Sequence, residues 1–313
     1  MGRRVLGLVF LAMLGFAAIA WAAPTSMDFL KISTLPRISA LGEAAVAVTD
    51  ATWADANPAH LTYLDGSLIT FSHTSWYEDI SLEGLTFGTS SGKHAFDLSV
   101  VGLHTEPLDG YDAEDRPTGT FRFFNFLVGA SYARALSPSL SLGVRGKTVY
   151  EKIDWDSATG FAVDFGAGYA PRRDLLGGRL SAGAALRNLG PKIAYFEEEF
   201  DLPLTWQAGV SYRPGWLPDM ISALAAVDYR RIRGEDGGVL VGVELGLMDM
   251  AALRFGHRGA YEEATATFGI GMTIANTLID YAYLDLGEDL GDTHRVSVAF
   301  KVGSVFPSPE ESR

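Results

Sequence analysis

The stretch Leu278–Val302, LIDYAYLDLGEDLGDTHRVSVAFKV, contains the pattern that decides the fold. Its second half alternates between apolar residues and the shorter or polar residues Arg, Ser, Ala and Lys. The apolar members of this alternation are Val296, Val298, Phe300 and Val302. Successive side chains of a strand point to opposite faces, so this half predicts a strand with one apolar and one polar face. Residues 279–283 alternate in the same way, and the Gly-rich stretch 287–292 is typical of a loop. The whole stretch therefore predicts a β-hairpin with two unlike faces.

The same alternation recurs from residue 67 to the end of this hairpin. Fourteen segments carry it: 67–75, 80–89, 94–102, 121–134, 139–152, 157–170, 178–188, 203–213, 221–231, 237–247, 250–258, 264–274, 278–285 and 293–302. Many approach the roughly 9–11 residues that a strand needs to cross a membrane. An even number of antiparallel strands is typical of bacterial outer-membrane barrels. We therefore predict an all-β fold, a single 14-stranded antiparallel transmembrane barrel over residues 67–303.

The connections between these segments alternate in length. Residues 248–249 and 275–277 are short connections, whereas Leu103–Thr120 and Asn188–Leu202 are long and acidic. Outer-membrane barrels have short periplasmic turns and longer outer loops. A soluble β-sandwich would also alternate, but strand length, loop asymmetry and an export signal favour the barrel.

The N-terminus predicts export. Residues 1–23 combine Arg3 and Arg4 with an apolar run and a small-x-small site, so cleavage is expected after Ala22. The chain has no Cys, which excludes disulfides, thiolate metal sites and a lipid-anchored start. The formal charge of −13 becomes −15 once Arg3 and Arg4 are removed, which argues against a nucleic-acid partner. We expect a multi-pass protein of a Gram-negative outer membrane, with membrane lipid as one partner.

Residues 24–66 lack alternation and are rich in Ala, and we predict that they form a hatch that plugs the barrel. Asn57 and Pro58 favour a compact reversal before the first strand. Polar side chains on the inner faces of the strands are expected to form ion-pair ladders to this hatch. The predicted lumen-facing polar residues are Arg145, Lys147, Asp164, Arg187, Asp228, Arg230, Glu244, Arg254, Asp280 and Arg295. Residues 304–313 are expected to be a short polar tail.

Several short blocks, in order along the chain, resemble the PorV/PorQ family of outer-membrane proteins. They include the block Arg37–Gly42, the turn Asn57-Pro58-Ala59 and the closing residues 280–283 and 290–295. The resemblance implies a barrel similar to the fatty-acid transporter FadL, whose superfamily carries an N-terminal hatch with an Asn-Pro-Ala turn. It makes Arg37, Gly42, Asn57, Pro58 and Ala59 the hatch motif. Where the family usually has Met-Gly-Gly, this chain has Leu41-Gly42-Glu43.

No pattern in the sequence indicates an enzyme, a cofactor or a metal centre. The six His residues show no metal-ligand spacing, and His294 and Ser297 fall on opposite faces of their strand. The acidic stretches 111–115 and 197–201 could supply oxygen ligands to calcium, although a solvated acidic loop is the simpler interpretation. Two roles remain open. The resemblance implies a non-enzymatic component of type IX protein secretion that handles cargo, and the alternative is a transporter of hydrophobic small molecules such as long-chain fatty acids.

Overall fold

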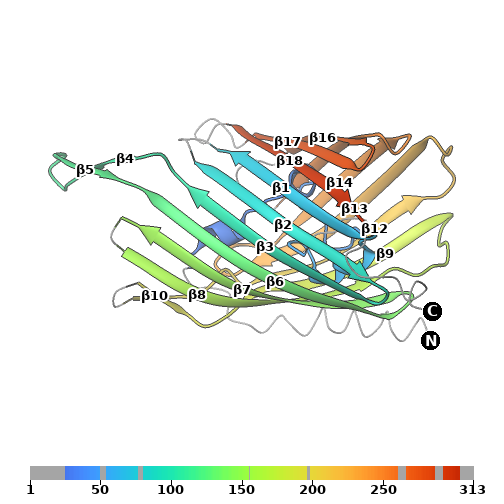
Figure 1. Cartoon of the computed structure of the whole chain (residues 1–313), viewed down its shortest axis with the longest axis horizontal. Coiled ribbons are helices and arrows are strands. Elements are labelled where there is room, and N and C mark those ends of the chain that lie inside the picture. The colour runs from blue at the N-terminus through green and yellow to red at the C-terminus, as the bar shows by residue number, and fades with distance from the viewer. Residues whose placement is uncertain are drawn as a thin grey trace.

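We analysed a computed structural model of the chain, drawn in Figure 1. The structure describes residues 25–49, 54–76, 80–154, 156–195, 198–259, 266–285 and 292–303. The predicted signal sequence and the predicted tail from residue 304 lie outside these residues. None of the described residues forms a helix that is long and apolar enough to span a membrane.

Fourteen antiparallel strands form one closed barrel, which confirms the predicted fold class. Each strand pairs with its neighbours around the wall, and β1 closes the barrel against β18. The strands are β1 (Ser67–Ser75), β2 (Ser81–Ser91), β3 (His94–His104), β6 (Phe123–Ser137), β7 (Leu140–Ile153), β8 (Asp156–Tyr169), β9 (Gly178–Leu189), β12 (Thr205–Pro214), β13 (Ile221–Ile232), β14 (Gly238–Leu247), β15 (Ala251–Arg258), β16 (Ala266–Ile274), β17 (Thr277–Asp285) and β18 (Asp292–Val302). Closure leaves no strand edge unpaired, as a wall in lipid requires.

The two faces of the wall differ as the alternation predicts. In β18, Arg295 and Ser297 are buried in the interior, whereas Val296 and Phe300 are each 42% exposed on the outside. Large apolar side chains lie exposed on all the other wall strands except β17, among them Phe71, Leu85, Leu98 and Phe161. So large an exposed apolar surface is unfavourable in water and suits a lipid environment.

Two small hairpins extend the long connections, and the alternation did not predict them. One joins β4 (Leu108–Tyr111) to β5 (Pro117–Phe121), and the other joins β10 (Ile193–Tyr195) to β11 (Glu198–Phe200). Strands of three to five residues are too short for a periodic signal to stand out. The first hairpin projects beyond the barrel in Figure 1. We call this end of the barrel the loop end and the opposite end, with the short connections, the turn end.

The N-terminal segment, residues 25–49 and 54–66, lies within the barrel (Figure 1). It contains three short helices: η2 (Asp28–Lys31), α2 (Pro36–Ala40) and η3 (Pro58–Tyr63). At the loop end, Thr25 bridges Asp201. At the turn end, the carbonyl oxygen of Leu64 accepts a hydrogen bond from the Ser90 hydroxyl. The segment thus runs along the interior from the loop end to the start of β1.

Candidate functional site

The first contact between the N-terminal segment and the wall is an ion-pair chain at α2. Pro36 occupies the first turn of this helix, where its missing N–H costs nothing. The next residue, Arg37, donates two hydrogen bonds of 2.7 Å to the Glu244 carboxylate of β14. Arg254 of β15 binds both Glu244 and Asp280 of β17 at 2.6 Å. Because both guanidinium groups are buried and paired with carboxylates, α2 is fixed to three strands of the wall.

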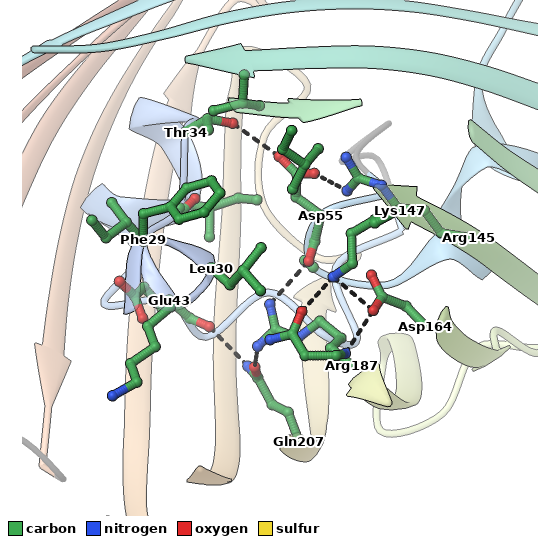
Figure 2. A pocket seen from close by; sticks show the side chains of 18 of the residues that line it. Phe29, Leu30, Thr34, Glu43, Asp55, Arg145, Lys147, Asp164, Arg187 and Gln207 are labelled. Carbon is green, nitrogen blue, oxygen red and sulfur yellow. Dashed lines mark hydrogen bonds and ion pairs between the residues drawn. The ribbon is translucent and has the colours of Figure 1, made fainter. Parts of the chain in front are cut away.

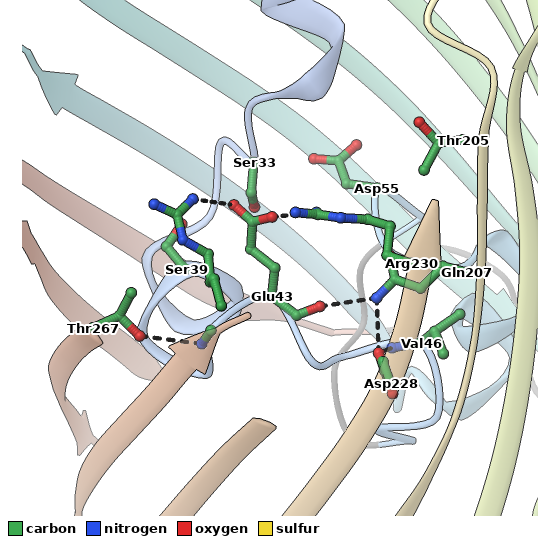
Figure 3. Close-up of polar contacts among 12 residues, drawn as sticks. Ser33, Ser39, Glu43, Val46, Asp55, Thr205, Gln207, Asp228, Arg230 and Thr267 are labelled. Atoms are coloured by element: carbon green, nitrogen blue, oxygen red, sulfur yellow. Dashed lines mark hydrogen bonds and ion pairs between the residues drawn. The ribbon is translucent and has the colours of Figure 1, made fainter. Parts of the chain in front are cut away.

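The turn after α2 is held by a residue in an unusual conformation. Gly42 and Glu43 both have positive φ angles, 60° and 64°. Glycine adopts this region easily, whereas for a longer residue it costs free energy. The Glu43 carboxylate binds Arg230 of β13 and Arg258 of β15, and these ion pairs offset that cost. Figure 3 shows the Glu43 carboxylate beside Arg230. The sequence Leu41-Gly42-Glu43 therefore forms a left-handed turn that is also anchored to the wall.

Backbone groups of the next residues are also bound by the wall (Figure 3). Asp228 accepts a 2.9 Å hydrogen bond from the Val46 amide. Gln207 donates to both the Glu43 carbonyl oxygen, at 2.9 Å, and Asp228, at 2.7 Å. Ser211 donates to the Ala47 carbonyl oxygen at 2.7 Å. These contacts satisfy polar backbone groups that would be costly to bury alone.

A second polar cluster surrounds Asp55 (Figure 2). The Asp55 carboxylate binds the Arg145 guanidinium of β7 and accepts a 2.9 Å hydrogen bond from the Thr34 hydroxyl. Arg187 of β9 donates to the Asp55 carbonyl oxygen at 2.9 Å. Beside this cluster, Lys147 pairs with Asp164 at 2.7 Å. The cluster therefore ties residues 34 and 55 of the segment to β7 and β9.

The Asn57-Pro58-Ala59 turn begins η3 and packs directly on the wall. The Asn57 side chain accepts from the Ala59 amide at 3.1 Å and donates to the carbonyl oxygens of Val46 and Ala167. Glycines of the wall make room for it, since a Cβ atom at Gly166 would lie 2.1 Å from the Asn57 oxygen. A Cβ atom at Gly143 would lie 2.3 Å from the Pro58 backbone. The Asn57 side chain thus caps η3 and also joins the N-terminal segment to β8.

Electrostatics favour the ionised forms of the segment's two central carboxyls. Burial alone would raise the pKa of Glu43, but the charges of Arg230 and Arg258 lower that pKa to about 2. Burial likewise opposes ionisation of Asp55, yet Arg145 holds the pKa of Asp55 below its ordinary value. Both carboxyls therefore stay charged at neutral pH, and their attraction to the wall persists.

The ten polar residues that the sequence predicts to face the lumen are distributed over these clusters. Those that contact the segment directly are Arg145, Arg187, Asp228, Arg230, Glu244 and Arg295, the last through Ser33 and Ser39. Arg254 and Asp280 act through Glu244, and Lys147 and Asp164 pair with each other. Sequence reasoning missed Arg258, although continuing the alternation from Arg254 would have placed it inside. It also missed Glu43 and Asp55 as anchors, because their irregular segment has no period from which to infer a direction.

Cavities lie along the N-terminal segment inside the barrel. A cavity of about 440 Å³ lies at the turn end and includes Leu35 and Tyr63 in its lining. A central one of about 60 Å³ lies among the charged groups of Figure 2. The third, which we call the loop-end cavity, has a volume of about 610 Å³. Its apolar lining comes from both the segment and the wall: Met27, Phe29, Ile32, Trp76, Ile80, Leu103, Phe123 and Ile153.

The described residues contain no group of three or more side chains that could hold a metal ion. In the acidic loop that sequence analysis considered for calcium, Asp112 and Glu114 instead each bind Arg116 at 2.8 Å. Of the second acidic stretch, Asp201 binds Arg233 at 2.6 Å.

No protein-family model and no curated protein sequence matches this chain. Solved structures do resemble it. The CymD monoaromatic hydrocarbon channel is 12% identical, with a TM-score of 0.59 over 90% of this chain and 100% of that one. The toluene transporter TodX of Pseudomonas putida is 10% identical, with a TM-score of 0.55 over 83% and 96% of the two chains. A FadL homologue of Pseudomonas aeruginosa is 11% identical, with a TM-score of 0.47 over 83% and 96%. The barrel therefore shares the fold of the CymD and TodX barrels.

Proposed function

We propose that this protein is an outer-membrane channel that takes up hydrophobic small molecules, with the loop-end cavity as their entry site. The observation that carries this proposal is the cavity itself, about 610 Å³, in which eight apolar side chains from the segment and the wall form part of a lining that also holds polar and charged groups. Small-molecule sites are typically concave and mostly apolar. The exposed apolar belt of the wall and the FadL-like fold support an outer-membrane location. The implied substrate class is hydrophobic small molecules.

In this proposal the N-terminal segment acts as the hatch. Its contacts lie between the loop-end and turn-end cavities, and its anchors on the wall are mostly ion pairs and hydrogen bonds. Because these groups are buried, an anchor separates from the wall only if water or a ligand takes over the contacts of both partners. A hatch held in this way closes the lumen to ions, and a ligand that displaces it must replace these contacts.

Uptake by cells that produce the protein tests the function. Leu103 lies in β3 and lines the loop-end cavity, whereas Leu98 of the same strand is 61% exposed on the outer face. We expect Leu103→Trp to reduce uptake of a radiolabelled hydrophobe severalfold by filling the cavity, and Leu98→Trp to leave uptake unchanged. Equal uptake by cells with and without the protein would refute the channel function.

A role in type IX secretion is the second candidate. The two parts of the chain that carry the PorV/PorQ resemblance meet in space: Arg37 reaches Asp280 through Glu244 and Arg254, and Arg295 donates to Ser33 at 2.6 Å. This juxtaposition supports a shared architecture with that family. Comparing the secreted proteins of a deletion strain and its parent tests it, and loss of exported cargo with intact hydrophobe uptake would favour secretion.

A further inference from the structure

Several charged side chains surround the loop-end cavity. Its cations are already engaged by the protein. Lys31 pairs with Asp28 and with Glu235, each at 2.8 Å. Burial alone would lower the pKa of Lys31, but these two carboxylates raise it, so the ammonium group stays charged and bound to them.

The two Arg residues of the cavity are engaged as well. Arg258 binds the Glu43 carboxylate at 3.3 Å. Arg295 donates to the Ser33 carbonyl oxygen at 2.6 Å and the Ser39 hydroxyl at 2.7 Å, and its guanidinium lies 6.0 Å from the centre of the Trp76 ring. Both guanidinium groups are therefore already held by groups of the N-terminal segment.

Glu151 is a cavity carboxylate that is hydrogen-bonded to a neutral group. It is 6% exposed in β7 and accepts a hydrogen bond from the Tyr195 hydroxyl. Burial and this bond raise the pKa of Tyr195, so the hydroxyl keeps its proton. Directly across in β6 stands Asn125, which is 1% exposed and uncharged. Among the described residues that line the cavity, Asp28, Glu43 and Glu235 are paired with cations, whereas Glu151 is bound by a neutral hydroxyl.

From these contacts, and resting on the proposed function, we infer that the loop-end cavity selects uncharged hydrophobes and excludes carboxylates, with Glu151 as the residue that determines the exclusion. The physical reason is like-charge repulsion in a poorly hydrated site, where two anions a few ångströms apart repel strongly. An alcohol or a hydrocarbon of the same size meets no such repulsion, and an alcohol can donate a hydrogen bond to Glu151.

A matched ligand pair tests the inference on the full-length protein in lipid nanodiscs. The probes are 1-naphthalenemethanol, which is neutral at pH 7, and 1-naphthoate, which has the same ring and a negative charge. Calorimetric titration gives the ratio of their affinities. We expect the wild type to prefer the alcohol by about tenfold or more, as repulsion by one buried charge predicts.

Two isosteric substitutions should move this ratio in opposite directions. Glu151→Gln removes the charge and should bring the ratio towards one, whereas Asn125→Asp adds a charge in the same row and should raise it. Glu106→Gln is the control, because Glu106 is exposed at the loop end and does not line the cavity. Equal binding of both probes to the wild type, or a ratio that Glu151→Gln leaves unchanged, would overturn the inference. Binding of neither probe would overturn the proposed channel function instead.

Discussion

Glu43 combines two features that work against each other at a single residue. Its φ of 64° is a conformation that costs a non-glycine residue about 1–3 kcal/mol when the surroundings enforce it. Its carboxylate is nevertheless bound by Arg230 and Arg258, which lower its pKa to about 2. Ionisation of this carboxyl therefore stabilises the turn.

The depressed pKa of Glu43 predicts an acid-sensitive hatch. Its ordinary pKa is 4.5 and the bound value is about 2, so the attachment is fully present above pH 4.5 and is lost as the pH falls towards 2. We expect the ion conductance of the full-length protein in planar bilayers to rise across this window. Glu43→Gln should conduct more at pH 7 and show a smaller rise. Wild-type conductance that stays flat from pH 7 to pH 2 would contradict the prediction.

The close packing of Gly183 in β9 against the N-terminal segment allows a second prediction for a single residue. A Cβ atom at this position would lie 1.8 Å from the Val46 carbonyl oxygen, so any side chain must displace the N-terminal segment. Gly183→Val should destabilise the closed arrangement by about 1–3 kcal/mol, as overpacking typically does, and raise conductance. Gly146→Val is the matched control, because a Cβ atom at Gly146 has no heavy atom within 4 Å. Equal conductance of the two variants would show that the close approach of Val46 to Gly183 does not keep the lumen closed.

At the scale of the strand, β18 offers two adjacent positions with opposite environments. Ser297 is 4% exposed and faces the turn-end cavity, whereas the side chain of Val298 faces outwards. Val298→Arg should impair folding from urea into lipid by about 2–4 kcal/mol, while Ser297→Arg should cost less. The two positions lie at nearly the same depth in the membrane. A difference in folding free energy between the two variants therefore reports which face of the wall each side chain occupies. Equal folding yields for the two variants would reverse the assignment of faces.

The N-terminal segment is the element whose role is most open to direct test. Deletion of residues 26–57 removes Arg37, Glu43 and Asp55, three anchors to the wall, and leaves every wall strand intact. We expect the shortened chain, with its signal retained, to assemble and to conduct ions in planar bilayers. The full-length chain should conduct little. If the two conductances are equal, the segment does not close the lumen.

The sequence predicts the wall strands better than it predicts the contacts of the N-terminal segment. The wall strands could be predicted to within three residues because a period of two persists over eight to fifteen residues in each. The inward direction of Arg145, Asp228 and Glu244 follows from the same period. Their partners in the segment could not be predicted, since pairs such as Arg37 and Glu244 lie 207 residues apart and join an irregular element to a regular one.

At the scale of the whole molecule, the asymmetry between the two ends predicts its orientation. The β4–β5 and β10–β11 hairpins lie at the loop end, while short connections and both ends of the wall, at Ser67 and Val302, lie at the turn end. Outer-membrane barrels expose long loops outside and short turns to the periplasm. We therefore expect the loop-end cavity to open towards the cell exterior.

Cysteine labelling tests this orientation without background, because the chain contains no Cys. Tyr111 lies at the loop end and is 60% exposed, and Asn276 lies in an exposed connection at the turn end. A membrane-impermeant maleimide should label Tyr111→Cys on intact cells and label Asn276→Cys only after the outer membrane is permeabilised. The reverse pattern would place the cavity on the periplasmic side. In that arrangement an apolar entry site would face the cell, and the direction of transport proposed above would have to be inverted.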